Sequence, residues 1–126
     1  MIGYVTLGTR DLARGARFYD ALAAEMGVAR MMENEQFIAW GPPGGGAGIG
    51  LTWPYDGAAA TVGNGTMVAL AAKDRAQVDR LHAVAMANGA ADEGAPGERF
   101  PGFYAAYFRD LDGNKLNAFV MTPLPE

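Results

Sequence analysis

The sequence predicts one α+β domain in which two βαβββ modules form a cupped mixed sheet around a cavity. Its length of 126 residues is typical of a single domain. Short β-rich apolar segments alternate with two stretches of helical periodicity. The second half of the chain also repeats the first, since a shift of 63 residues places Val5 on Val68, Asp11 on Asp74 and Arg17 on Arg80.

The first half of the chain predicts one helix and four strands. A strand is expected at residues 2–8, and Asp11 follows as a helix N-cap, because its carboxylate can accept from the free amides of a first turn. Apolar residues then recur at spacings of three and four up to Met26, and Gly27 is expected to end the helix. Three further strands are expected at residues 28–32, 36–41 and 48–53.

The second half repeats this order. We expect a strand at residues 66–72, an N-cap at Asp74 and a helix that Gly89 ends. A short strand at 90–93 and a proline-containing loop at 95–102 should follow. The Asp112-Gly113 pair lies between two apolar runs and indicates a hairpin, with strands at 103–109 and 115–121.

The repeat divides the single domain, residues 1–126, into two modules. Module 1 is expected at residues 1–54 and module 2 at 64–122, joined by a linker at 55–63. Each module would leave one face of its sheet uncovered by its own helix. Two such faces can enclose a cavity that suits a small ligand.

Composition excludes several classes of function. A net charge of −4 argues against nucleic acid and anionic membrane surfaces as partners, because both need a basic face. The chain has no cysteine, which excludes thiolate metal sites, and its one histidine, His82, excludes a two-histidine site within one chain. The N-terminal segment lacks the pattern of a signal peptide, and no apolar run is long enough to span a bilayer. We expect a soluble cytoplasmic protein.

For three motifs we favour a structural role over a catalytic or ligand-binding role. His82 could act as a general base, but it takes the repeat position of Tyr19 and is expected at the sheet interface or the surface. Asp110, Asp112 and Asn114 resemble a calcium loop, yet the later ligands of an EF-hand are missing, so a turn is expected. The glycine-rich run 44–50 lacks a following Lys-Ser or Lys-Thr pair and precedes a strand, which indicates a flexible loop.

Aromatic residues and one arginine predict an organic-ligand pocket. The residues that could line the cup are Trp40, Trp53, Tyr55, Phe100, Phe103, Tyr104, Tyr107 and Arg109. Of these, Arg109 could hold a carboxylate. Because side chains alternate along a strand, only about half of the set can face inward. The alternative is ordinary sheet core, with Arg109 paired to Asp110 or Asp112 at the surface.

Four segments of the chain resemble the vicinal oxygen chelate superfamily, which includes glyoxalases, bleomycin-resistance proteins and extradiol dioxygenases. The opening segment is similar to the first strand and helix of that family, and Gly63-Asn64-Gly65-Thr66-Met67-Val68-Ala69 to the start of its second module. The segments 93–97 and 104–116 resemble its C-terminal loop and hairpin. The resemblance implies paired βαβββ modules, a cupped sheet and often a homodimer.

The same resemblance places the family's metal-ligand positions on Tyr4, Gly50, Met67 and Asn117. The family's metalloenzymes typically carry His at the places of Tyr4 and Met67 and Glu at that of Asn117. Zn, Ni, Mn and Fe sites are built from imidazole nitrogen and carboxylate oxygen, and none of these four residues supplies either. We therefore expect no metal and no cofactor. We expect Tyr4, Met67 and Asn117 to line a ligand pocket, with Trp53, Tyr104, Tyr107 and Arg109 as further members.

Three functions fit these observations. The first is a metal-free protein that binds a small apolar or aromatic ligand, as a homodimer. The second is a glyoxalase-like lyase, isomerase or dioxygenase that depends on a metal or uses a non-metal acid or base such as Tyr4, with Arg109 as an electrostatic stabiliser. The third is a dimeric interaction module whose cup is filled by its own side chains.

Overall fold

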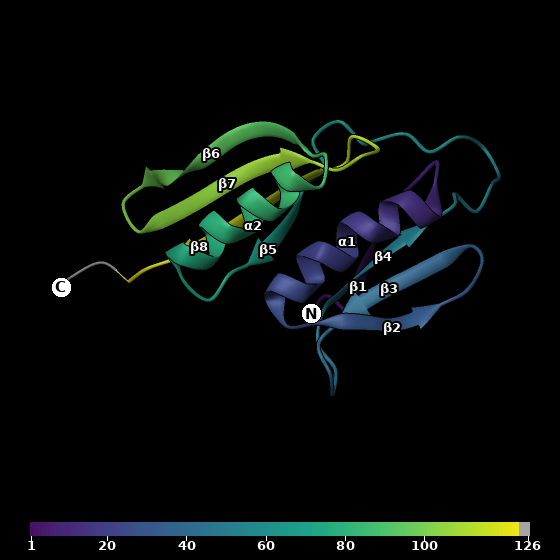
Figure 1. Ribbon diagram of the computed structural model, residues 1–126, viewed down its shortest axis with the longest axis horizontal. Helices are drawn as coiled ribbons and strands as arrows, with labels where there is room; N and C mark the ends of the chain where they lie inside the picture. Colours follow the sequence, from purple (N-terminus) through teal and green to yellow (C-terminus); the bar gives the residue numbers. More distant parts are fainter. Residues whose placement is uncertain (124–126) are drawn as a thin grey trace.

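Two modules of the same topology form the molecule, whose computed structural model describes residues 1–123 (Figure 1). In module 1 the first strand, β1, pairs in parallel with the fourth, and the sheet order is β1-β4-β3-β2. The strands pack against a single helix, α1. The elements of module 1 are β1 (Tyr4–Gly8), α1 (Leu12–Met26), β2 (Ala29–Glu33), β3 (Phe37–Gly41) and β4 (Gly48–Thr52).

Module 2 has the same arrangement, with the sheet order β5-β8-β7-β6 and a parallel pair between β5 and β8. This confirms the α+β class and the two βαβββ modules with mixed sheets that the repeat predicts. Its elements are β5 (Val68–Ala71), α2 (Arg75–Ala87), β6 (Ala91–Phe100), β7 (Phe103–Arg109) and β8 (Lys115–Met121).

The helix ends lie where the sequence places them. The side chain of Asp11 accepts from the amide of Arg14, and that of Asp74 accepts from the amide of Gln77 at 2.8 Å. Gly27 adopts φ 73°, a left-handed conformation that glycine tolerates without strain, and ends α1. Asn88 is the C-cap of α2, and Gly89 follows it.

The expected loop at residues 95–102 is wrong, because β6 continues to Phe100. Pro96 suggests a loop, since proline cannot donate to a strand ladder. However, β6 is an edge strand, so it needs donors on one side only. Its pairing with β7 is also irregular around Gly94 and Gly97, which leaves room for the proline.

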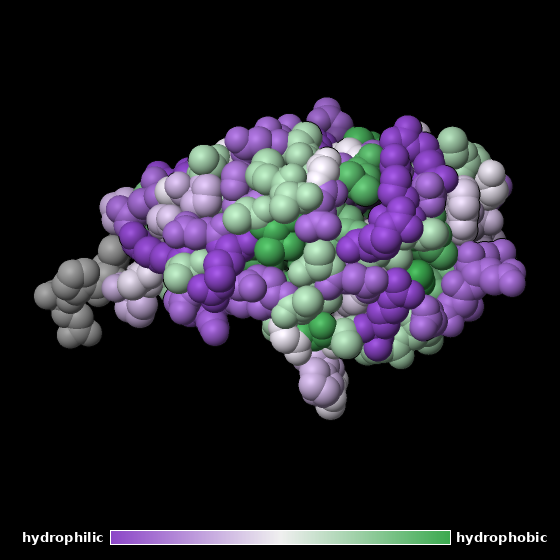
Figure 2. All heavy atoms as spheres, in the orientation of Figure 1, coloured by the Kyte–Doolittle hydropathy of each residue, from purple (hydrophilic) through white to green (hydrophobic). Residues whose placement is uncertain are grey.

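The two helices pack against each other and against their own sheets (Figure 1). The fully buried side chains come from both modules and include Phe18 and Leu51 of the first and Leu81 and Phe108 of the second. The helix side of the surface is a mixture of hydrophilic and hydrophobic residues (Figure 2). No helix within residues 1–123 is long and apolar enough to cross a membrane.

Candidate ligand-binding site

The face of the module 2 sheet that points away from α2, called the open face below, carries three of the predicted site residues, Asn117, Tyr107 and Arg109. Side chains alternate along β8, so Asn117 lies on the face opposite to Leu116 and Ala118, which are buried in the core. Residues directly opposite in an antiparallel pair share a face. The register therefore places Tyr107 beside Asn117, and Arg109 beside Lys115.

Asn117 is the most unusual residue of this face. It is 2% exposed, and its side-chain oxygen Oδ1 has no hydrogen-bond partner among the described residues. Buried polar atoms are nearly always paired, because an unpaired one loses its bonds to water without replacement. An acceptor that the protein leaves unpaired can be satisfied by a water molecule or by a ligand that supplies a donor.

Tyr107 brings two cations to the centre of the open face. The guanidinium carbon of Arg99 lies 5.3 Å from the centroid of the Tyr107 ring, and Nζ of Lys115 lies 5.7 Å from it. Both distances are within the range of cation–π attraction. Arg99 folds back over the ring because Gly94 and Gly97 lack side chains, and a Cβ at either position would lie 3.0 Å from the guanidinium.

Arg109 lies beside Lys115 on the open face, but its guanidinium already has hydrogen-bond partners within the protein. Its Nε donates to Oε1 of Glu93 at 2.9 Å, and its Nη1 donates to the carbonyl of Gly113 at 3.0 Å. Glu93 also lies 4.0 Å from Lys115. Arg109 is thus paired with Glu93, whereas the alternative weighed from the sequence paired it with Asp110 or Asp112.

Aromatic side chains form the opposite end of the open face. Phe100 and Phe103 stack at 4.7 Å between ring centroids, and Phe103 stacks on Phe119 at 5.9 Å. Phe100 and Phe103 belong to the aromatic set noted in the sequence, but Phe119, Lys115 and Arg99 do not. Alternation with Asn117 along β8 could have indicated Phe119 and Lys115, since both are two residues from it. Arg99 carries no such signal.

Tyr104 lies on the other side of the same sheet. Its hydroxyl donates to Oδ1 of Asp79 in α2 at 2.6 Å, and the Arg75 guanidinium lies 4.9 Å from its ring centroid. The hydrogen bond to Asp79 is the largest cause of a raised pKa at Tyr104. Tyr104 therefore joins α2 to β7 and is not adjacent to Asn117.

The remaining predicted residues lie at the ends of strands. Tyr4 begins β1 and is 66% exposed, Met67 directly precedes β5, and Trp53 directly follows β4. A Cβ on Gly50 would lie 2.5 Å from the Phe37 ring, so Phe37 occupies the space of a side chain at that position. Of the two metal-ligand positions in module 1, Tyr4 and Gly50, only Tyr4 has a polar side chain, a phenol.

The donor set does not fit the metal site that the family resemblance implies. None of Tyr4, Gly50, Met67 and Asn117 supplies an imidazole or a carboxylate. No group of three or more His, Asp or Glu side chains within residues 1–123 could hold a metal ion.

His82 and the turn at residues 110–114 make hydrogen bonds within the protein, as their structural interpretation predicts. The ring nitrogen Nε2 of His82 lies 3.0 Å from Oδ1 of Asp92, which joins α2 to β6. Backbone amides of Asp112 and Asn114 donate to Oδ1 of Asp110, as in a turn stabilised by its own side chain. These carboxylates are used within the protein.

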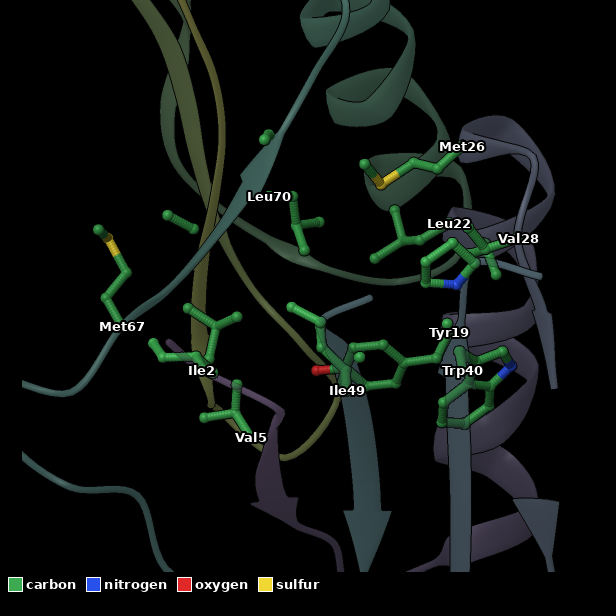
Figure 3. A pocket seen from close by; sticks show the side chains of 18 residues that line it. Ile2, Val5, Tyr19, Leu22, Met26, Val28, Trp40, Ile49, Met67 and Leu70 are labelled. Atoms are coloured by element: carbon green, nitrogen blue, oxygen red, sulfur yellow. The ribbon is translucent and has the colours of Figure 1, made fainter. Parts of the chain in front are cut away.

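An apolar groove of about 620 Å³ lies between the modules, apart from Asn117 (Figure 3). Figure 3 shows that side chains of α1, β1, β4 and β5 surround it, among them Leu22, Val5, Ile49 and Leu70. Its volume is in the range of pockets for small organic molecules. The sequence predicts a cavity enclosed by the two sheet faces, whereas this groove lies among α1, β1, β4 and β5. Of the candidate residues, Met67 and Trp40 line it.

These elements define a protein of the paired βαβββ class, in which the open face of module 2 bears a buried amide, cations and stacked aromatics. The family model for the glyoxalase/bleomycin resistance protein/dioxygenase superfamily matches residues 1–118. The chain belongs to this superfamily, which confirms the resemblance that its segments show.

Solved structures agree with this assignment. A glyoxalase/bleomycin resistance protein from Albidiferax ferrireducens is 38% identical, with a TM-score of 0.87, and the match covers 94% of this chain and 97% of that one. A hypothetical protein from S. aureus is 25% identical, with a TM-score of 0.74, and the match covers 93% and 91%. Lactoylglutathione lyase from Agrobacterium tumefaciens is 20% identical, with a TM-score of 0.68 and coverage of 94% and 92%, and shares the fold. No curated protein matches the chain.

Proposed function

We propose that this protein binds a small organic ligand with apolar or aromatic character and does so without the metal of its enzyme relatives. One observation carries the proposal. At the four positions where relatives hold a metal, this chain has Tyr4, Gly50, Met67 and Asn117, and the ring of Phe37 fills the space beside Gly50. The adjoining surface instead offers aromatic rings and a buried amide, which suit an organic molecule.

We also propose that the binding form is a homodimer. Large apolar side chains are exposed at Tyr4, Met31, Met32, Met67 and Met121. Each of β1 and β5 is paired on one side only, which leaves a strand edge open in each module. Light scattering is expected to give a mass near twice the 13.2 kDa of one chain. A cytoplasmic location stays a prediction that subcellular fractionation would test.

Metal content is the first test of the proposed function. Protein purified without tag or chelator should be incubated with Ni, Zn, Mn or Fe(II) and measured by plasma mass spectrometry. We expect less than about a tenth of an equivalent per chain, since no imidazole or carboxylate is offered at the four positions. Near one equivalent, lost in a Tyr4→Phe, Asn117→Leu variant, would overturn the metal-free proposal and make lyase and dioxygenase assays the next step.

Ligand binding is the second test. A thermal-shift screen of small organic molecules is expected to find aromatic compounds that raise the melting temperature in proportion to their concentration. A bound compound that is recovered unchanged supports binding without chemistry. Turnover of that compound would favour the enzyme alternative, and a screen without any stabilising compound would favour a filled, vestigial cup.

A further inference from the structure

We propose that the open face of module 2 selects an aromatic organic anion that carries a hydrogen-bond donor between its ring and its carboxylate. The inference rests on the proposed function and specifies the ligand class of the same site. Three features in a row along β8 carry it: cations at Lys115, the orphaned amide at Asn117 and stacked rings at Phe119.

The side-chain amide of Asn117 is the reason that the ligand needs a hydrogen-bond donor. Oδ1 of Asn117 is a pure acceptor, and it has no partner within residues 1–123. A ligand N–H or O–H placed against it restores the hydrogen bond that burial removes. A ligand without a donor leaves the acceptor unpaired, so the site discriminates between two otherwise similar molecules.

The positive charges on the open face are the reason that the ligand should be an anion. Arg109 and Lys115 both lie near one carboxylate, Glu93, which Arg109 holds at 2.9 Å. Arg99 donates to the backbone carbonyls of Ala95 and Gly97 and has no ion pair within residues 1–123. A local excess of positive charge on a chain of net charge −4 attracts a carboxylate and fixes its position.

The aromatic end places the ring. Residues two apart on a strand are separated by about 6.6 Å, so Lys115, Asn117 and Phe119 mark three steps along one line. The ring of the ligand stacks on Phe103 and Phe119, and its hydrogen-bond donor contacts Asn117. Its carboxylate then lies near the long cationic side chains of Lys115 and Arg99. Because Oδ1 is buried, side chains around Asn117 must move to admit the donor.

Two probes of this chemistry are hippurate and mandelate, each with a ring, a donor and a carboxylate. Their matched comparators are N-methylhippurate and phenylacetate, which lack the donor, and the methyl esters of both probes, which lack the charge. Binding to the full chain is measured by calorimetry and by amide chemical shifts at Asn117 and Tyr107. We expect each comparator to bind at least about tenfold more weakly than its probe. The comparators without a donor lose a hydrogen bond to a buried group, and the esters lose a charge-assisted contact with the cations.

Variants assign each preference to its residue. Asn117→Leu should bind hippurate and N-methylhippurate equally, while wild type prefers hippurate. Arg99→Met with Lys115→Met should reduce the preference for hippurate over its ester by at least about tenfold. Arg14→Met, which removes a cation from α1, is the matched control and should leave both ratios unchanged.

The outcomes separate this inference from the proposed function. Equal binding of esters and acids, or an unchanged donor preference in Asn117→Leu, would overturn the inference while a ligand-binding function stands. Absence of any saturable shift at Asn117 and Tyr107 with either probe would overturn it as well, and the broader screen would then decide the proposed function.

Discussion

The hydroxyl of Tyr19 in α1 donates to Oδ2 of Asp110 at 2.7 Å, and this buried hydrogen bond joins the two modules. Asn114 strengthens the same junction, because its Nδ2 donates both to Oδ2 of Asp110 and to the carbonyl of Gly8. Thr9 adds a third link through a 2.6 Å bond to Oδ2 of Asp112. The turn between β7 and β8 therefore fixes module 1 against module 2.

Replacing Tyr19 with phenylalanine should destabilise this junction. The change removes one hydrogen bond to a buried carboxylate and leaves the ring in place, so we expect a loss of about 1–3 kcal/mol in the free energy of unfolding. Urea unfolding followed by circular dichroism measures it. Tyr55→Phe is the control, because Tyr55 is fully exposed, and an equal effect of the two changes would contradict the assigned role.

Alkaline pH should weaken the wild-type protein more than the Tyr19→Phe variant. Burial, and next the carboxylate of Asp110, raise the pKa of Tyr19 well above its ordinary value of 10.0. The unfolded chain then releases a proton that the folded chain keeps, so stability is full below about pH 10 and falls as pH rises.

The check is the urea midpoint between about pH 8 and about pH 11 in both proteins. Tyr104 also has a raised pKa, through its hydrogen bond to Asp79, so some alkaline loss should remain in Tyr19→Phe. Parallel curves for the two proteins would show that Tyr19 ionises as easily when folded as when unfolded.

The two helix N-caps offer a matched pair of variants. Oδ1 of Asp74 accepts from the Gln77 amide at 2.8 Å, and Oδ1 of Asp11 accepts from the Arg14 amide at 3.1 Å. Asp74→Ala and Asp11→Ala should each cost about 1 kcal/mol, because a free amide of the first turn loses its acceptor. Asp74→Asn keeps an acceptor and should stay within a few tenths of wild type in thermal melts.

Local signals made the fold readable from the sequence. Helix ends depend on interactions between residues close in the sequence, as at the N-caps Asp11 and Asp74 and at the left-handed Gly27. The sequence therefore predicts both helices correctly. The extension of β6 through Pro96 was missed, because it depends on the strand lying at the edge of the sheet.

The site was less predictable, because it depends on strand register and on contacts between distant segments. The sequence grouped Tyr104 with Tyr107, yet their odd spacing along β7 puts them on opposite faces. Arg99 reaches Tyr107 only because the irregular pairing of β6 folds it back. The hydrogen bond between Tyr19 and Asp110 joins residues that no short motif connects.

Asn117→Leu should make the ligand-free protein more stable. The amide oxygen is buried without a partner among the described residues, and leucine, which is branched at the same atom, removes that unpaired acceptor from the sheet. We expect a gain of about 1 kcal/mol in the free energy of unfolding, together with weaker ligand binding. Thermal melts without ligand measure the gain, and Asn117→Asp, which buries a charge at the same place, should instead be destabilised. A loss of stability in the leucine variant would mean that the fold itself needs the amide. A gain means that Asn117 is kept at the expense of stability, as expected for a residue that serves a ligand.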